Sequence, residues 1–371
     1  MAYVERNTET TSPVRLALIG SGWIGAFHAE SAAARIGGTR LEAIADPALG
    51  PATELADRLG VAKVTANPAD LFVDPDVDGV IIAAPARFHS SLIAAAAAAG
   101  KHVFCEKPAA RTLEELDDAL AAVEEAGVEL QIGFNRRFAA DFAAAKRTID
   151  AGSVGEPRLL RSLTRDPNTT DAIPNADRTP QWTIFLETLI HDFDTLNWFN
   201  QGAVPEQVHV MADALVEPSL KDAGYLDTAV VTIRYSNGAI AVAEANFSAL
   251  YGYDVRGEVF GSAGMVQAGS LHKTSATSYT AHGFSGETPR LNVELFHDAY
   301  TAEIAHFAEV IRSRRDGTPA PELVAPGGAD ARAALALALA CIKSVDTSAP
   351  VNLADVLPAA VQASALPADA R

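Results

Sequence analysis

The chain has 371 residues, of which 49% are hydrophobic and 20% charged, and 47 acidic against 29 basic residues give a formal net charge of −18. This length predicts two domains, because one hydrophobic core rarely serves more than about 250–300 residues. The negative charge disfavours nucleic acids and anionic membranes as partners, since both are bound through basic patches.

Cysteine usage and hydropathy favour a cytoplasmic protein. Cys105 and Cys341 show neither a disulfide pattern nor the spacing of a metal site. Residues 1–12 lack the apolar core of a secretory signal, and the longest apolar run, 333–342, is too short to span a membrane. We therefore expect no membrane partner and no metal.

The first third of the chain alternates strand-like and helical segments. The strand-like segments are residues 14–19, 41–45, 78–83, 102–105 and 128–132. The helical segments are 23–36, 51–59, 90–99 and 112–126. The last of these helices opens on Thr112 with Glu115 three residues later, which is a capping box. This alternation predicts an α/β domain built on a doubly wound parallel sheet.

The pattern changes after residue 135. One helix is expected over 185–199 and two more over 299–313 and 329–344. Strands are expected over 158–163, in a hairpin of 230–235 with 239–247, and in a second hairpin of 255–260 with 265–268. We predict an α+β domain with a large, mostly antiparallel open sheet. The expected division is 13–135 and 136–357, with tails at 1–12 and 358–371.

A G-x-G-x-x-G sequence follows the first predicted strand and opens the first predicted helix. Gly20 allows a tight turn, Gly22 lets the backbone approach a pyrophosphate, and Gly25 lets helix and strand pack closely. Asp46 ends the second strand 21 residues after Gly25, the distance expected of an acidic residue that binds ribose hydroxyls. A carboxylate there repels the 2′-phosphate of NADP, so NAD is favoured. The alternative is a glycine-rich turn in an unrelated α/β protein.

Two further segments contain candidate catalytic side chains. Lys107 stands just after a strand that ends in a parallel sheet, where ligands bind, although a surface lysine in a loop is an equal interpretation of the local sequence. Glu187, His191 and Asp194 are spaced i, i+4 and i+7, which places them on one face of an α-helix. A satisfied buried histidine and a metal pair are the alternatives for that face.

The order of these motifs resembles the Gfo/Idh/MocA oxidoreductases. The resemblance rests on GSGWIG at 20–25, AAPARFH at 83–89, CEKP at 105–108, GFNRRF at 133–138, ETLIHDFD at 187–194 and GSAG at 261–264, and it covers roughly residues 13–345. Within the family, FNRRF and LRSLTRDP are most similar to inositol 2-dehydrogenases. The resemblance implies a Rossmann domain followed by a substrate-binding and oligomerisation domain.

The resemblance also implies residue roles. Lys107 matches the lysine that holds the reacting hydroxyl oxygen, and His191 matches the general base. Glu187 is the third candidate catalytic residue, at a position where inositol dehydrogenases usually carry Asp. The expected substrate contacts are Lys107, Arg136, Thr164, Asp166, Glu187 and His191. The expected cofactor contacts are Gly20, Gly22, Trp23, Ile24, Gly25, Asp46, Ala84, Pro85, His89, Glu106 and Lys107.

These roles predict an NAD-dependent dehydrogenase that oxidises a ring alcohol of a cyclic polyol, with myo-inositol or a stereoisomer as the specific expectation. Thr164 and Asp166 replace the His and Asn of the familiar pattern, so an aldose or anhydrosugar substrate is the alternative. A non-catalytic NAD-binding sensor is less favoured, because a sensor needs no base. The open sheet predicts a homotetramer or dimer.

Overall fold

The computed structural model describes residues 12–167 and 181–357, so the expected tail at 358–371 and all but the last residue of the expected tail at 1–12 lie outside the described residues. The chain forms two compact units. The first contains the residues up to Cys105, Ala121–Gln131 and Ile304–Val324, and the second contains Glu106–Leu120, Ile132–Glu303 and the residues from Ala325 onward. From the sequence we predicted that the chain passes only once from the first domain to the second, near residue 135. The return of a late segment to the first unit was not predicted.

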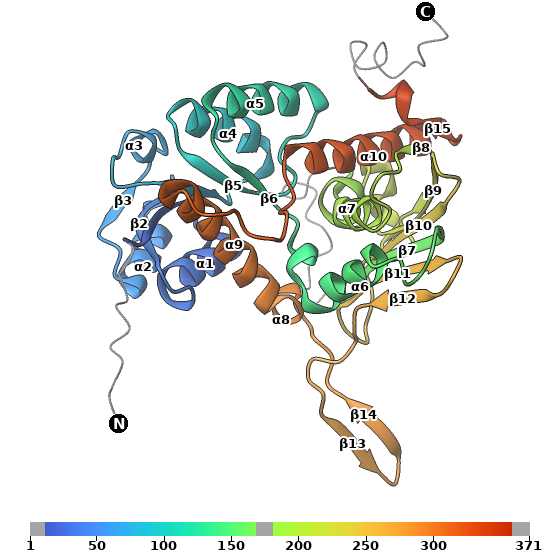
Figure 1. Cartoon of the computed structure of the whole chain (residues 1–371). Helices are drawn as coiled ribbons and strands as arrows, with labels where there is room; N and C mark the ends of the chain where they lie inside the picture. Colours follow the sequence, from blue (N-terminus) through green and yellow to red (C-terminus); the bar gives the residue numbers. More distant parts are fainter. Residues whose placement is uncertain (1–11, 168–180, 358–371) are drawn as a thin grey trace, which may run out of the picture. The chain divides into compact units, whose positions relative to one another are not determined.

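The first sheet confirms the predicted doubly wound fold (Figure 1). Within the described residues its six strands lie in the order β3-β2-β1-β4-β5-β6, and the ladders from β3 to β5 are all parallel. The strands are β1 (Val14–Ile19), β2 (Thr39–Ala45), β3 (Lys63–Thr65), β4 (Gly79–Ile82), β5 (His102–Glu106) and β6 (Leu130–Gly133). The helices between them are α1 (Trp23–Glu30), α2 (Leu49–Leu59), α3 (Ala69–Phe72), α4 (His89–Ala98) and α5 (Leu113–Ala126).

A late helix completes the core of the first unit. Helix α9 (His297–Asp316) contributes Ile304, Phe307 and Ile311 to the same buried cluster as the apolar side chains of β1, β2, α1 and α2. Phe307 packs on Phe104 of β5 with ring centroids 6.1 Å apart. This long-range packing explains why the second half of α9 belongs to the first unit, although the sequence pattern predicts that the first domain ends near residue 135.

The second unit is built on a mostly antiparallel sheet, as predicted. In the described part of the chain its order is β12-β11-β7-β10-β9-β8-β15, and only the β7–β10 pair is parallel among its ladders. The strands are β7 (Pro157–Arg165), β8 (Pro205–Asp213), β9 (Thr228–Tyr235), β10 (Ile240–Asn246), β11 (Asp254–Gly261), β12 (Met265–Ala268) and β15 (Val351–Asn352). Both predicted hairpins, β9–β10 and β11–β12, are confirmed.

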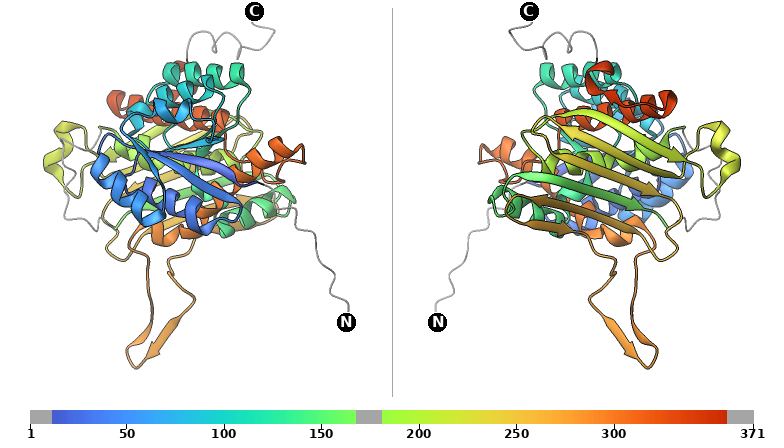
Figure 2. Two further views of the ribbon diagram at one scale, coloured as in Figure 1. Left: turned by 90° about the vertical axis from the view of Figure 1, so that its left-hand side faces the viewer. Right: turned by 90° about the vertical axis from the view of Figure 1, so that its right-hand side faces the viewer.

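Among the described residues, helices cover one face of this sheet and leave the other open. Helices α6 (Ala140–Asp150), α7 (Ile190–Phe199) and α10 (Gly328–Thr347) lie on one side (Figure 1), and the right-hand view of Figure 2 shows the bare strands of the opposite side. The alternation of buried and exposed residues along β9 reflects the two environments. The second unit also carries α8 (Asn292–Leu295) and a projecting hairpin of β13 (Thr277–Thr280) with β14 (Gly283–Gly286), which the sequence patterns did not predict.

Two helices differ from their predictions in a way that matters for the site. The expected helix over 23–36 is α1 followed by a π-helical segment, Ser31–Arg35. The expected helix over 185–199 begins with a π-helical segment, Ile184–Leu189, before α7 continues. A π-helical turn contains more residues than an α-turn, so it rotates the side chains that precede α7.

The capping box at α5 is partly confirmed. The Thr112 hydroxyl accepts a hydrogen bond from the Glu115 backbone N–H at 3.2 Å, as predicted. The Glu115 carboxylate accepts a hydrogen bond from the backbone N–H of Arg111, one residue before the expected position.

A search of the described residues for a membrane-spanning helix found none with the required length and hydropathy.

Candidate active site

The glycine turn after β1 has the geometry that dinucleotide binding requires. Gly20 has a φ of +95°, and a Cβ there would lie 2.7 Å from the backbone of Ala83. A Cβ at Gly25 would lie 2.0 Å from the Gly20 carbonyl oxygen, so this position admits only glycine. A Cβ at Gly22 would meet open space within 4 Å, which leaves room for a phosphate above the turn at the start of α1.

Asp46 is tied directly to this turn. Its Oδ2 accepts hydrogen bonds from the Ser21 backbone N–H at 2.7 Å and from the Ser21 hydroxyl at 2.9 Å. The carboxylate at the end of β2 therefore stays beside the turn as a hydrogen-bond acceptor, which fits the ribose hydroxyls of NAD and opposes an additional phosphate. Sequence spacing identified Asp46 but not Ser21, because the contact depends on the shape of the turn.

The other expected cofactor residues of the first unit follow the carboxyl ends of its strands, either on loops or in the first turn of the next helix. The His89 ring nitrogen Nε2 is 2.6 Å from the Ala84 carbonyl oxygen, which fixes the loop that contains Pro85. The Trp23 side chain, at the beginning of α1, is 62% exposed. An exposed indole beside a glycine turn is available to pack on a flat ligand.

Lys107 lies one residue beyond β5 and reaches the segment that contains His191. Its ammonium Nζ donates a hydrogen bond to the backbone carbonyl of Glu187 at 2.9 Å. The interpretation of Lys107 as a surface lysine is therefore wrong, since the side chain is partly buried and bound to a distant segment. Glu106, the last residue of β5, is buried.

His191 occupies the first turn of α7. Its ring meets Phe134 edge to face, with centroids 6.0 Å apart. Burial, then the positive charge of Lys107 and then that of Arg136 hold the pKa of His191 well below its ordinary value of 6.5. The imidazole is therefore neutral at pH 7, which is the form that accepts a proton.

The three acidic and basic side chains expected on one helix face do not remain together. Glu187 lies in the π-helical segment, and its backbone carbonyl binds Lys107. Asp194 instead receives hydrogen bonds from Arg137 in a buried ion pair, and Arg137 also contacts Asp330 at 2.7 Å. Asp194 is therefore structural, whereas Lys107 contacts the backbone of Glu187 in the segment just before α7, and its charge acts on His191.

Arg136 and Thr164, both expected to contact substrate, belong to one buried network. The Arg136 Nη1 donates to Asp192 Oδ1 at 2.8 Å, and Nη2 donates to the Thr164 hydroxyl at 2.6 Å. The Ser162 and Thr164 hydroxyls donate to Asp192 at 2.6 and 2.7 Å. The side chains of Arg136 and Asp192 are only 4% and 0% exposed, so this network can support the helix that carries His191. A role of Arg136 and Thr164 in substrate contact stays a prediction.

Sequence reasoning missed Asp192, although it directly follows His191. It also missed the partly buried Tyr253 and the buried Tyr300, whose pKa values are raised chiefly by loss of contact with water. Asp166, which was expected to bind substrate, is partly exposed, and its negative charge also raises the pKa of Tyr253. None of these groupings has a local sequence pattern, because their members come from separate strands and helices.

Comparison with known proteins agrees with this geometry. Residues 14–134 match the Gfo/Idh/MocA oxidoreductase family with an NAD-binding Rossmann fold, and residues 142–267 match a Gfo/Idh/MocA C-terminal domain. The chain is 36% identical over 346 residues to myo-inositol 2-dehydrogenase of Thermotoga maritima, covering 93% of this chain and 100% of that protein. It is 35% identical over 340 residues to scyllo-inositol 2-dehydrogenase (NAD(+)) of Bacillus subtilis, covering 92% and 96%.

A solved structure shows the same architecture. The crystal structure of scyllo-inositol dehydrogenase from Lactobacillus casei, with bound NAD(H) and scyllo-inositol, superposes with a TM-score of 0.86 at 27% identity and covers 92% of this chain and 100% of that chain. The glycine turn with Asp46, the lysine after β5 and the histidine on α7 agree with the family matches in both units. The chain therefore belongs to the Gfo/Idh/MocA oxidoreductase family.

Proposed function

We propose that this NAD-dependent dehydrogenase oxidises a ring secondary alcohol of an inositol, with myo-inositol as substrate and a keto-inositol as product. The observation that carries the proposal is the meeting of the Lys107 ammonium with the segment that holds a neutral His191. The names of the Thermotoga, Bacillus and Lactobacillus relatives support an inositol as the substrate class. We also propose a cytoplasmic location, because Cys105 and Cys341 show neither a disulfide pattern nor the spacing of a metal site.

The residues divide the work of the reaction between charge and proton transfer. Lys107 donates a hydrogen bond to the reacting hydroxyl oxygen and stabilises negative charge as it develops there. His191 accepts the hydroxyl proton, because its neutral imidazole has a lone pair to receive it. Bound NAD, which fits the cradle at Gly22 and the Asp46 carboxylate, supplies the acceptor for the hydride. Glu187 and Asp166 are the proposed contacts for the remaining substrate hydroxyls.

A substrate panel tests the proposal. Purified protein is mixed with NAD or NADP and myo-, scyllo- or D-chiro-inositol, glucose, xylose or levoglucosan, and NADH or NADPH formation is followed by absorbance. We expect turnover of an inositol with NAD and much weaker turnover with NADP. Turnover of an aldose or anhydrosugar alone would contradict the inositol proposal. Tight NAD binding with no turnover of any compound would favour the sensor interpretation.

Replacement of Lys107 tests the role of the ammonium. We expect Lys107→Ala to lower kcat by about 10²–10⁴-fold, since it removes a charged donor aimed at the reacting oxygen. The dissociation constant for NAD, measured by fluorescence titration, should change by less than about threefold. Lys343→Ala is the matched control, because Lys343 is an exposed lysine that also donates to a backbone carbonyl. Loss of NAD binding in Lys107→Ala would show that the lysine acts on the cofactor instead.

The lowered pKa of His191 predicts the acidic limb of the pH profile. A base that must be neutral loses activity as the pH falls through its folded-state pKa, and that pKa lies well below 6.5. We therefore expect kcat/KM to stay level from pH 7.5 down past pH 6.5 and to fall only at more acidic pH. His191→Asn should abolish the limb together with most of the activity. A wild-type limb centred at or above pH 6.5 would contradict the proposed environment of His191.

The open face of the second sheet supports our proposal that the chain forms a homotetramer or dimer. Exposed apolar side chains lie on that face, and they include Leu159, Val230, Ile240, Phe260 and Met211. A second copy that packs sheet to sheet would remove them from water.

Light scattering tests this assembly. We expect the wild type to have a multiple of the single-chain mass of 38.9 kDa, and Val230→Asp to shift the mass downward. Val324→Asp is the control, because Val324 is equally apolar, 81% exposed and located in the first unit. A wild-type mass of one chain would refute the assembly.

A further inference from the structure

Residues 131–137, which we call the support segment, lie against the helix that carries His191. Phe134 packs edge to face on the His191 ring, with centroids 6.0 Å apart. The two arginines of the segment form ion pairs with the two aspartates that follow His191 on α7. Beyond the end of β6 the chain forms only a short 3₁₀-helix, Asn135–Phe138. Because 3₁₀ hydrogen bonds have poor geometry, contacts with other segments must fix the position of this part of the chain.

His306 of α9 holds the beginning of the support segment. Its Nε2 donates a hydrogen bond to the backbone carbonyl of Leu323 at 2.8 Å. Its Nδ1 lies 3.0 Å from Oε1 of the Gln131 side-chain amide. Both His306 and Gln131 are buried, so little water competes for these contacts. One imidazole therefore joins β6 to the loop between α9 and α10, and we call this contact the His306 clamp.

The same loop continues along the support segment. The backbone N–H of Ile132 donates a hydrogen bond to the carbonyl of Pro326 at 2.8 Å. At the other end of the segment, Arg137 Nη2 donates to Asp330 Oδ1 at 2.7 Å. Residues 323–330 are thus bonded to both ends of the support segment, and the His306 clamp fixes the end where the two segments first meet.

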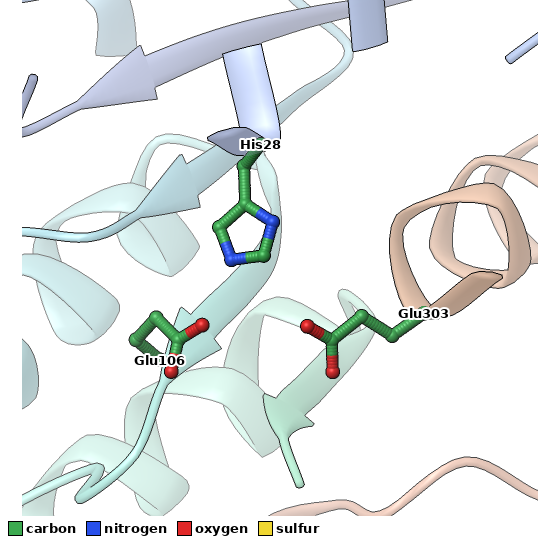
Figure 3. A group of neighbouring side chains, drawn as sticks. All are labelled: His28, Glu106 and Glu303. Atoms are coloured by element: carbon green, nitrogen blue, oxygen red, sulfur yellow. The ribbon is translucent and has the colours of Figure 1, made fainter. Parts of the chain in front are cut away.

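Helix α9 gives His306 a fixed place. Ile304 and Phe307, on either side of His306, lie in the buried apolar cluster of the first unit. One turn before His306, Glu303 is fully buried, and Figure 3 shows its carboxylate directed toward that of Glu106 at the end of β5. Successive turns of α9 are therefore packed in the protein interior, where local opening is least frequent.

We propose that His306 is a positioning residue for His191, because its clamp fixes the segment against which the proposed base packs. Proton transfer requires close alignment, and a misplacement of about 1 Å can lower a rate about 10²-fold. A loosened support segment would release Phe134 from the imidazole and the arginines from α7. The role at His191 rests on the proposed function, whereas the His306 clamp does not.

Hydrogen exchange, followed by mass spectrometry, tests the clamp without substrate. His306→Leu cannot bond to Gln131 or Leu323, and we expect the Ile132 amide to exchange at least about tenfold faster than in the wild type. His306→Gln offers both a donor and an acceptor, and it should keep this exchange within about threefold of the wild type. Unchanged exchange of Ile132 in folded His306→Leu would overturn the proposal.

Two further variants make this test specific. His297→Leu is the matched control, because it makes the same change at an exposed position of α9 and should leave the exchange of Ile132 unaltered. Gln131→Met removes the side-chain amide from the other side of the clamp, and we expect it to accelerate the same exchange. It decides the question where His306→Leu does not fold, since wild-type exchange in Gln131→Met would also refute the clamp.

The pH profile tests the positioning role. Burial, followed by the charges of Lys107 and Arg136, lowers the pKa of His191, so water that reaches a loosened imidazole should raise that pKa. We expect His306→Leu to lower kcat at least about tenfold and to move the acidic limb of kcat/KM upward by at least about 0.5 pH unit. His306→Gln should restore both the rate and the limb.

Two results would count against the positioning role. One is rapid exchange of Ile132 in His306→Leu together with the kcat and the acidic limb of the wild type. The other is a lower kcat with an unmoved limb, which a loss of stability alone would produce. If the wild type oxidises no inositol, the proposed function fails by itself, and hydrogen exchange still decides whether His306 clamps the support segment.

Discussion

The buried ion pair between Arg136 and Asp192 is the interaction on which the proposed catalytic group depends. Charges buried this deeply are stable only when hydrogen bonds replace the lost water, and the hydroxyls of Ser162 and Thr164 supply those bonds. The network joins β7 to the first turn of α7, where His191 lies two residues after the end of the π-helical segment. Its geometry therefore sets the position of the imidazole more firmly than local helix propensity could.

The same charges determine protonation. Lys107 and Arg136 both place positive charge near His191, and burial adds to their effect on its pKa. The arrangement keeps the imidazole neutral, which is the form that the proposed proton transfer from the substrate hydroxyl requires. An unperturbed histidine, with a pKa of about 6.5, would instead be partly protonated close to neutral pH.

Local patterns predicted much of this molecule because they reflect local physics. Alternation of strands and helices gave the parallel sheet, and the glycine spacing located Asp46 beside the turn. What local patterns did not predict depends on contacts between distant segments, namely the packing of Ile304 and Phe307 in the first unit and the Asp192 network. The π-helical segment was missed for a related reason, since its sequence is equally compatible with an α-helix and tertiary contacts decide its winding.

The contact between Lys107 and Glu187 also bears on specificity. The backbone carbonyl of Glu187, not its carboxylate, accepts the hydrogen bond from the lysine. The placement of Lys107 is therefore insensitive to whether residue 187 is Glu or the Asp that is usual in inositol dehydrogenases. The additional methylene of Glu187 acts only on the groups that its carboxylate reaches. We infer that the substitution alters which substrate hydroxyls are recognised and leaves the catalytic pair unchanged.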